Sequence, residues 1–457
     1  MTRLKALSKS HDKVKGYRAE LAILSSKMTR GIILLMSSAP SSAPLFSRAQ
    51  RRCHLLLLLF LPAPALTLEK LCQLNGVDPV VSRQDIADVG DEIQRFHQLE
   101  LHQMVDGSFR IHGTELDRRL CLLHWLRRAL RLSQDFVCEH FAPVLRQRLK
   151  VLNIEKALWD ETNLQALIQH CSLRLARNFT PRDRLFLQIF MKYALCQRQN
   201  ALFSEKQRTW LSAKTERAAA DDVIHHWQKR CHLAPHVSET DFWTLLFSLI
   251  HAPDGHQLDD HQSQKLMLAV EALIARFEQL AQTRIKNQHQ LKLQLFTHLA
   301  QALDRSHFAI GIDNSVALDV AHLYPRLLRT TERALYHFSS DFGTQFSAEE
   351  VSLVAVLFGA WLMQESALQE KQVLLLTGAD AAMEQLLEQQ IREITLLPIN
   401  ITYQDMLHFQ REGAPRDVAL VITPYATSLP LFSPPLIHAE LPLSYHQQQR
   451  IRQLLEA

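Results

Sequence analysis

A histidine and an arginine that lie seven residues apart could perform the chemistry of a phosphorylation switch. His298 and Arg305 belong to a stretch whose apolar residues recur at helical spacing, so both side chains should lie on one helix face, two turns apart. A phosphate on the imidazole would add about one to two negative charges, and the guanidinium could clamp its oxygens. The spacing alone fits equally well with a histidine that packs at a helix edge, because the chain contains 23 histidines.

Further residues follow this pair in a specific order, namely a leucine directly after His298, then Arg305, Asn314 and the dipeptide Tyr324-Pro325. This order resembles the second half-signature of a PTS regulation domain, the all-helical module of bacterial antiterminators and activators. Glu350 and the run VSLVAVLFGAWL extend the resemblance. It implies an all-helical domain over residues 259–366, in which His298 is the phosphorylation candidate with Arg305 beside it. It also implies a phosphocarrier protein of the phosphotransferase system as a partner, and a homodimer through these domains.

A second, upstream copy of the same domain is predicted over residues 153–254. Met191 precedes Arg198 by seven residues, as His298 precedes Arg305, which indicates an internal repeat. Thioether and isobutyl groups cannot carry phosphate, so His298 alone remains of the positions where the family places phosphorylatable histidines. The other three positions hold Met191 and, seven residues after Glu239 and Glu350, Leu246 and Leu357.

The region 48–135 predicts a helix-turn-helix followed by a hairpin. An apolar-patterned helix from Leu66 reaches a turn at Gly76, and Ser82 is expected to cap a second helix. The segment LELHQMVDGSFRIHG then alternates apolar and polar residues around an Asp-Gly turn. The block resembles the winged helix of antiterminator-like activators, including a G-x-E-x-x-R that begins at Gly113. Residues 117–135 predict a basic amphipathic helix, which could contact phosphates, bind a partner or form a solvated face that joins the wing to the next domain, and we favour the solvated face.

DNA is a candidate partner of this block, and the sequence leaves its binding open. A helix in the major groove needs donors for phosphates and base edges, and the candidates are Arg83, Gln84, Arg95 and the wing residue Arg110. The same helix carries Asp85, Asp88, Asp91 and Glu92, which would repel DNA unless they face away. The alternative is a protein-interaction scaffold that no longer contacts DNA.

Charge and cysteine usage indicate a cytoplasmic protein with no membrane segment. The net charge is +4, but residues 1–35 supply +6 and leave the remainder at −2, without a basic footprint for nucleic acid. The Ser/Pro-rich extension 1–47 is expected to be disordered, and the sequence leaves open whether translation starts at Met1 or Met36. The apolar run after Arg52 is too short to cross a bilayer and predicts a buried first helix. The seven cysteines form no C-x-x-C pair, which is typical of reduced thiols.

The C-terminal residues 371–457 predict a small parallel α/β domain, because short apolar strands alternate with helices. It resembles the EIIB-like domain of some of these activators, which carries a phosphorylated cysteine after the first strand. Here that position is about Thr377, and no cysteine follows Cys231. We therefore expect this domain to accept no phosphoryl group.

The predicted protein is mainly α: a winged helix-turn-helix, two all-helical domains and the α/β domain. No P-loop, catalytic triad, metal constellation or cofactor cradle is visible in the sequence, so we expect no enzyme, metal or cofactor. The favoured function is regulation of transcription, responsive to phosphorylation at one remaining histidine.

Overall fold

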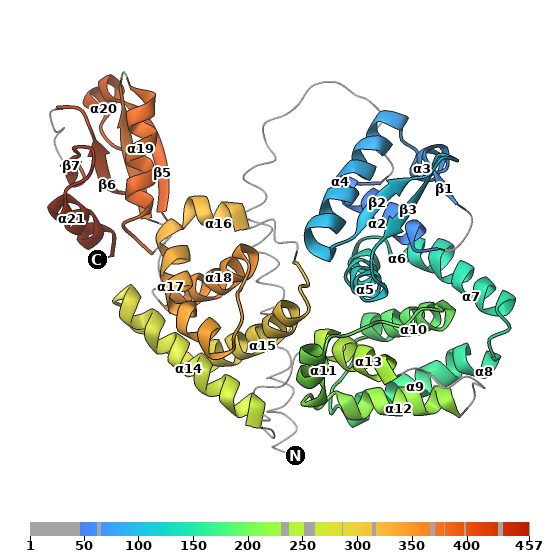
Figure 1. Ribbon diagram of the computed structural model, residues 1–457. Coiled ribbons are helices and arrows are strands. Elements are labelled where there is room, and N and C mark those ends of the chain that lie inside the picture. The colour runs from blue at the N-terminus through green and yellow to red at the C-terminus, as the bar shows by residue number, and fades with distance from the viewer. Residues whose placement is uncertain are drawn as a thin grey trace, which may run out of the picture.

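The computed structural model describes residues 46–61, 65–229, 237–250, 261–285, 287–312, 317–365, 371–378, 380–396, 399–427 and 433–456. Helices dominate these residues, and a small sheet domain ends the chain, so the predicted mainly α class is confirmed (Figure 1). The predictions for the extension up to residue 45, for the start at Met1 or Met36 and for Asn314 fall outside the described residues.

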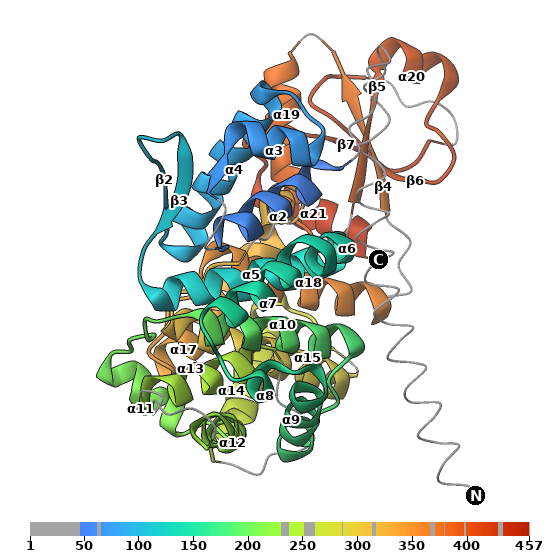
Figure 2. The same cartoon turned by 90° about the vertical axis from the view of Figure 1, so that its right-hand side faces the viewer.

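The N-terminal domain combines four helices with a three-stranded antiparallel sheet of order β1-β3-β2. The predicted turn at Gly76 is present, because Gly76 has a left-handed conformation and ends helix α3 (Leu68–Asn75). The predicted hairpin joins β2 to β3 through Gly107. The hairpin projects from the edge of the molecule (Figure 2). The elements are α2 (Arg48–Leu59), β1 (Leu66–Thr67), α3 (Leu68–Asn75), α4 (Pro79–His97), β2 (Glu100–Gln103), β3 (Ser108–His112) and α5 (Glu115–Leu132).

Helix α4 begins earlier than predicted, so the assignment of Ser82 as its cap is wrong. Asp78 caps the helix, and its carboxylate accepts hydrogen bonds from the backbone N–H groups of Val80 and Val81. Asp at the cap followed by Pro79 at the first helical position is a stronger start signal than a serine one turn later. Ser82 is instead fully buried inside the helix.

Two further predictions concern helices of this domain. Helix α2 is buried as expected, with Leu55, Leu56 and Leu57 fully enclosed. Helix α5 is not the solvated face predicted for residues 117–135, because it packs against α2, α4 and α10. Carboxylates pair with two of its arginines, namely Arg128, which binds Glu92, and Arg119, which binds Glu115 and is only 1% exposed.

Two helical domains follow, with six and five helices among the described residues. Short helices α6 (Gln134–Phe136), η1 (Val137–Phe141) and α7 (Ala142–Val151) lead into the first. The first helical domain comprises α8 (Lys156–Trp159), α9 (Glu161–Arg174), α10 (Pro181–Cys196), α11 (Glu205–Ser212), α12 (Arg217–Gln228) and α13 (Val237–Ile250). The second comprises α14 (His261–Ala281), α15 (Gln288–His307), α16 (Ala317–Leu323), α17 (Pro325–Asp341) and α18 (Ala348–Glu365).

The hydrophobic cores divide the chain differently from the helix order. The N-terminal domain and the first helical domain share one continuous core, and Phe308, which follows α15, belongs to it. The second helical domain has a core of its own. In Figure 1 the second helical domain lies between the first helical domain, which it contacts through α15 and α13, and the C-terminal domain.

The C-terminal domain is a parallel four-stranded sheet of order β5-β4-β6-β7. Its central strand β4 is buried on both faces, which explains its unbroken apolar run: Val373 and Leu375 join one core, Leu374 and Leu376 another. Helix α20 was not predicted. The elements are β4 (Lys371–Thr377), α19 (Ala381–Arg392), β5 (Ile399–Asp405), α20 (Met406–Glu412), β6 (Val418–Thr423), β7 (Leu436–His438) and α21 (Tyr445–Glu456).

None of the helices in the described part of the chain is both long and apolar enough to cross a bilayer.

Candidate functional site

His298, Arg305 and Glu350 come together in the second helical domain. His298 and Arg305 lie on α15, and Glu350 lies in the first turn of α18. The Nε2 atom of His298 is 3.2 Å from Oε2 of Glu350, without hydrogen-bond alignment. Arg305 binds both carboxylate oxygens of Glu350, with Nη2 3.1 Å from Oε2 and Nε donating to Oε1. The predicted pair therefore shares a single carboxylate.

The environment of this carboxylate favours its charged form. The Glu350 side chain is only 7% exposed, and burial alone would raise its pKa. The contacts with His298 and Arg305 outweigh burial and lower the pKa of Glu350 from 4.5 to about 2. The Ser347 hydroxyl also accepts a hydrogen bond from the Glu350 backbone N–H and so fixes the start of α18.

A phosphoryl group on His298 would disturb this arrangement. It would place negative charge beside Glu350, and its oxygens would compete with that carboxylate for the guanidinium of Arg305. The His298 side chain is 18% exposed, so it is half-buried. The site can thus respond to charge, because three ionisable side chains meet where two helices pack.

The other three positions of the pattern carry no such chemistry. Met191 and Leu246 are fully buried in the core, and Leu357 is partly buried. Their side chains fill space between helices, in agreement with the prediction that they cannot hold phosphate.

The first helical domain nevertheless keeps a glutamate where the second has Glu350. Glu239 lies in the first turn of α13, and Nη1 of Arg119 on α5 lies 3.0 and 2.8 Å from its two oxygens. Glu115 completes this cluster, at 2.8 Å from Nε of Arg119. Sequence reasoning missed the cluster, although the glutamate that recurs seven residues before Leu246 and Leu357 could have indicated a paired carboxylate in both domains.

The second candidate site is the exposed face of α4. The predicted DNA contacts Arg83, Gln84 and Arg95 are all exposed on this helix, and Arg110 is exposed on β3. The structure thus brings three of the predicted residues to one helix and places the fourth on the adjacent hairpin strand.

Three of the four acidic residues of α4 are buried or half-buried and pair with arginines of neighbouring helices. Asp85 is 2% exposed and binds Arg51 of α2 at 2.7 Å. Asp88 binds Arg48 and Arg52, which also belong to α2. The third, Glu92, binds Arg128 of α5 at 2.8 Å, so Asp91 alone of the four is exposed.

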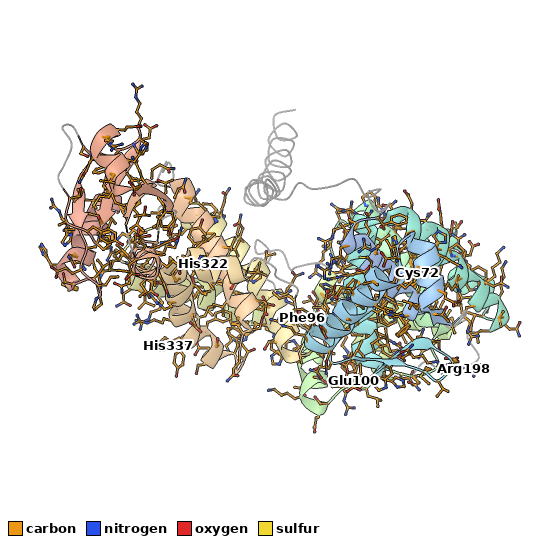
Figure 3. All side chains as sticks on the ribbon, turned by 90° about the horizontal axis from the view of Figure 1, so that it is seen from above. Cys72, Phe96, Glu100, Arg198, His322 and His337 are labelled. Carbon is orange, nitrogen blue, oxygen red and sulfur yellow. The ribbon has the colours of Figure 1, made fainter. Side chains whose placement is uncertain are left out.

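Arg95 and the region around it contact the second helical domain. Nη2 of Arg95 lies 2.6 Å from Oε1 of Glu349, the residue before Glu350. Phe96 accepts a hydrogen bond from the Gly311 N–H at 2.9 Å. Figure 3 shows Phe96 where the N-terminal domain meets the second helical domain.

The loop after β4 in the C-terminal domain is occupied by its own carboxylate. Thr377 ends the strand as predicted, and the Gly378 N–H donates to Glu384 at 2.6 Å. The Tyr425 hydroxyl donates to the same oxygen at 3.0 Å. No cluster of three or more metal-ligating side chains is found in the described ranges.

Comparisons with known proteins cover both the helical and the α/β parts. The model of the PRD domain matches residues 271–361, which include His298, Arg305 and Glu350. The model described as "Stationary phase-inducible protein CsiE, C-terminal domain" matches residues 371–455. The chain is 46% identical over 423 residues to stationary phase-inducible protein CsiE of Escherichia coli (strain K12), an alignment of 92% of this chain and 99% of that protein.

Proposed function

Because this chain belongs to the family of stationary phase-inducible protein CsiE and carries a PRD domain, we propose that it regulates transcription by binding DNA through α4 and the β2–β3 hairpin. The PRD domain supports a regulatory role. The winged helix-turn-helix assignment and the DNA contacts are part of the proposal.

The observation that carries the proposal is the division of charge on α4. The sequence sets four acids against two bases on this helix, but Asp85, Asp88 and Glu92 are paired with arginines of α2 and α5. The outer face therefore presents two arginines and two glutamines with one acid, the composition expected of a helix that contacts phosphates and base edges.

The N-terminal half of α4 is the part expected to reach base edges. In helix-turn-helix proteins the first residues of the recognition helix read bases. Arg83 and Gln84 occupy that place here, while Gln84 also donates to Asp88 at 2.9 Å. Arg110 on the hairpin would then contact the phosphate backbone beside the groove.

A DNA-binding assay on the full chain tests this proposal. We expect genomic fragments to be retained with sequence preference and with an affinity that falls steeply as salt rises. Arg83→Ala should cost about 1–3 kcal/mol on a preferred site, and Arg110→Ala should weaken binding to all sequences alike. Arg182→Ala removes an exposed arginine from α10 and is the charge-matched control. Equal affinity in all three variants would exclude α4 and the hairpin as the interface.

The second candidate function is a protein-interaction scaffold that does not bind DNA. One observation favours it: Arg95 is already paired with Glu349, and Asp91 is exposed on the same face. Absence of DNA binding, even at low salt concentration, would support the scaffold.

The proposed signal is phosphorylation of His298 by a phosphocarrier protein of the phosphotransferase system. The phosphoryl group would pass from a histidine of the carrier to a ring nitrogen of His298, as the N–P bond on the carrier breaks and the displaced proton goes to the carrier imidazole. Loss of the Glu350 contact would then change packing within a homodimer formed through the helical domains.

A further inference from the structure

We propose that the second helical domain occupies the C-terminal end of the exposed face of α4, so that Glu349 and Gly311 compete with the phosphates of DNA for that end of the helix. This inference rests on the proposed DNA-binding function of α4. It adds an intramolecular partner that holds the helix when DNA is absent.

The first contact is an ion pair across the two domains. Arg95 on α4 and Glu349 on α18 are separated by 254 positions in the sequence, and Nη2 lies 2.6 Å from Oε1. The Glu349 side chain is 15% exposed, while the Arg95 side chain is 68% exposed. The guanidinium also stacks over the ring of Phe96, with 5.0 Å between Cζ and the ring centroid. Arg95 is therefore both oriented and neutralised by the second helical domain.

The second contact requires a glycine. The Gly311 N–H donates to the backbone oxygen of Phe96, and a Cβ atom at Gly311 would lie 2.7 Å from Cα of Phe96. Such a distance is far below normal contact, and backbone cannot move aside as a flexible side chain can. The end of α4 thus fits against the segment after α15 only because residue 311 has no side chain.

Both contacts lie next to the candidate phosphorylation site. Glu349 directly precedes Glu350, which binds His298 and Arg305. The backbone oxygen of Arg305 accepts a hydrogen bond from the Ile310 N–H at 2.8 Å, and Gly311 follows. A change at His298 therefore reaches the end of α4 through α18 and through the C-terminal end of α15.

The geometry explains why DNA and this contact compete. A duplex that lies along the exposed face of α4 would bring its phosphates toward Arg95, where the carboxylate of Glu349 now lies. Negative charges would then face one another, and Arg95 cannot serve both partners. Binding of DNA along the whole helix thus requires the second helical domain to move away.

The contact itself is measured by hydrogen exchange on the full chain without DNA. The Gly311 amide is protected by its bond to Phe96, so exchange in a peptide that contains Gly311 reports opening directly. We expect Glu349→Gln to speed this exchange by about 2- to 5-fold, as for a partly exposed ion pair. Gly311→Ala should open the contact about ten-fold or more, and the amide of the substituted residue 311, compared with that of Ala in an unstructured peptide, reports it in that variant. Glu332→Gln, at an exposed position of α17, and Gly90→Ala, where an added Cβ meets ordinary contacts, should leave exchange unchanged. Unchanged exchange in both test variants would overturn the proposal.

The competition is measured by titration of the same variants with DNA. We expect Glu349→Gln and Gly311→Ala to bind DNA about 2- to 10-fold more tightly than the unmodified chain, and the slope of log affinity against log salt to steepen by about one phosphate contact. Faster exchange with unchanged DNA affinity would overturn competition. If no variant binds DNA, the proposed function fails, and the exchange data still decide whether the second helical domain holds α4.

Discussion

Arg119 and Glu239 form an ion pair buried between the N-terminal domain and the first helical domain, with Nη1 of the arginine 3.0 and 2.8 Å from the two carboxylate oxygens. The arginine is 1% exposed and also binds Glu115 and the backbone oxygen of Gln199. In the second helical domain the corresponding carboxylate belongs to the site of His298. The glutamate in the first turn of α13 thus binds the N-terminal domain to the first helical domain, whereas the glutamate in the first turn of α18 binds the candidate phosphorylation site.

Truncation of this arginine should destabilise the chain strongly. Arg119→Ala would remove the arginine that binds both buried carboxylates and would leave Glu239 without this ion pair, and breaking a buried pair typically costs about 3–5 kcal/mol. We expect the free energy of the first urea-unfolding transition, followed by circular dichroism, to fall by that amount. Arg182→Ala is the exposed control and should change stability by less than about 0.5 kcal/mol. Equal losses in the two variants would contradict a structural role for the cluster.

Glu350 should make stability depend on acidity. Its pKa is lowered from 4.5 to about 2, so the unfolded chain binds its proton more tightly than the folded chain does. The resulting stabilisation, on the order of 3 kcal/mol, is present above pH 4.5 and is lost as pH falls from 4.5 toward 2. Glu350→Gln should therefore be less stable than the unmodified chain at pH 7, and the difference should shrink at pH 3. Urea unfolding at the two pH values measures it, with Glu332→Gln as the control. A difference that does not change with pH would refute this role of Glu350.

The sequence predicts which residues form both candidate sites, but not which side chains bind those residues in the folded chain. A single sequence shows local patterns, and both the helical spacing of His298 and Arg305 and the predicted internal repeat rest on such patterns. The carboxylate between them comes from another helix 45 residues away, so nothing in the local pattern indicates that it binds both. The inward orientation of Asp85 and Asp88 likewise depends on arginines of α2, at separations of 34 and more residues.

The misjudged helix illustrates the same limit. The high arginine content of residues 117–135 predicts a solvated face. Arginines in this helix are buried or half-buried where the fold brings carboxylates such as Glu92 and Glu239 to α5. Charge on a helix predicts exposure only when no opposite charge is brought to it. That information lies in long-range packing.

The C-terminal domain should accept no phosphoryl group. Thr377 offers a hydroxyl rather than a thiolate, and Glu384 already binds the Gly378 N–H and the Tyr425 hydroxyl, two donors that could otherwise hold phosphate oxygens. Incubation of the full chain with phosphorylated carrier proteins, followed by digestion and mass spectrometry, should give no label on the peptide that contains Thr377. Stable label on that peptide would contradict the prediction.

His298 is the residue through which we expect phosphotransfer to act, and the expected result is a change in assembly. Met191, Leu246 and Leu357 cannot carry phosphate, and a phosphoryl group on His298 would draw Arg305 away from Glu350. An unpaired, buried Glu350 is costly, so the start of α18 should repack, and a dimer that uses this surface should gain or lose stability.

The measurement compares the unmodified chain with His298→Ala and His298→Asp. With phosphoenolpyruvate and the phosphocarrier system present, phosphohistidine should be detected in the unmodified chain and not in His298→Ala. Analytical ultracentrifugation should then show a different monomer–dimer ratio for the phosphorylated chain, and His298→Asp should shift in the same direction without any phosphate, because it places a negative charge beside Glu350. His289→Ala, on the same helix but outside the pattern, is the matched control and should behave as the unmodified chain does. Label that persists in His298→Ala, or the same ratio in all of these proteins, would show that His298 only packs between α15 and α18.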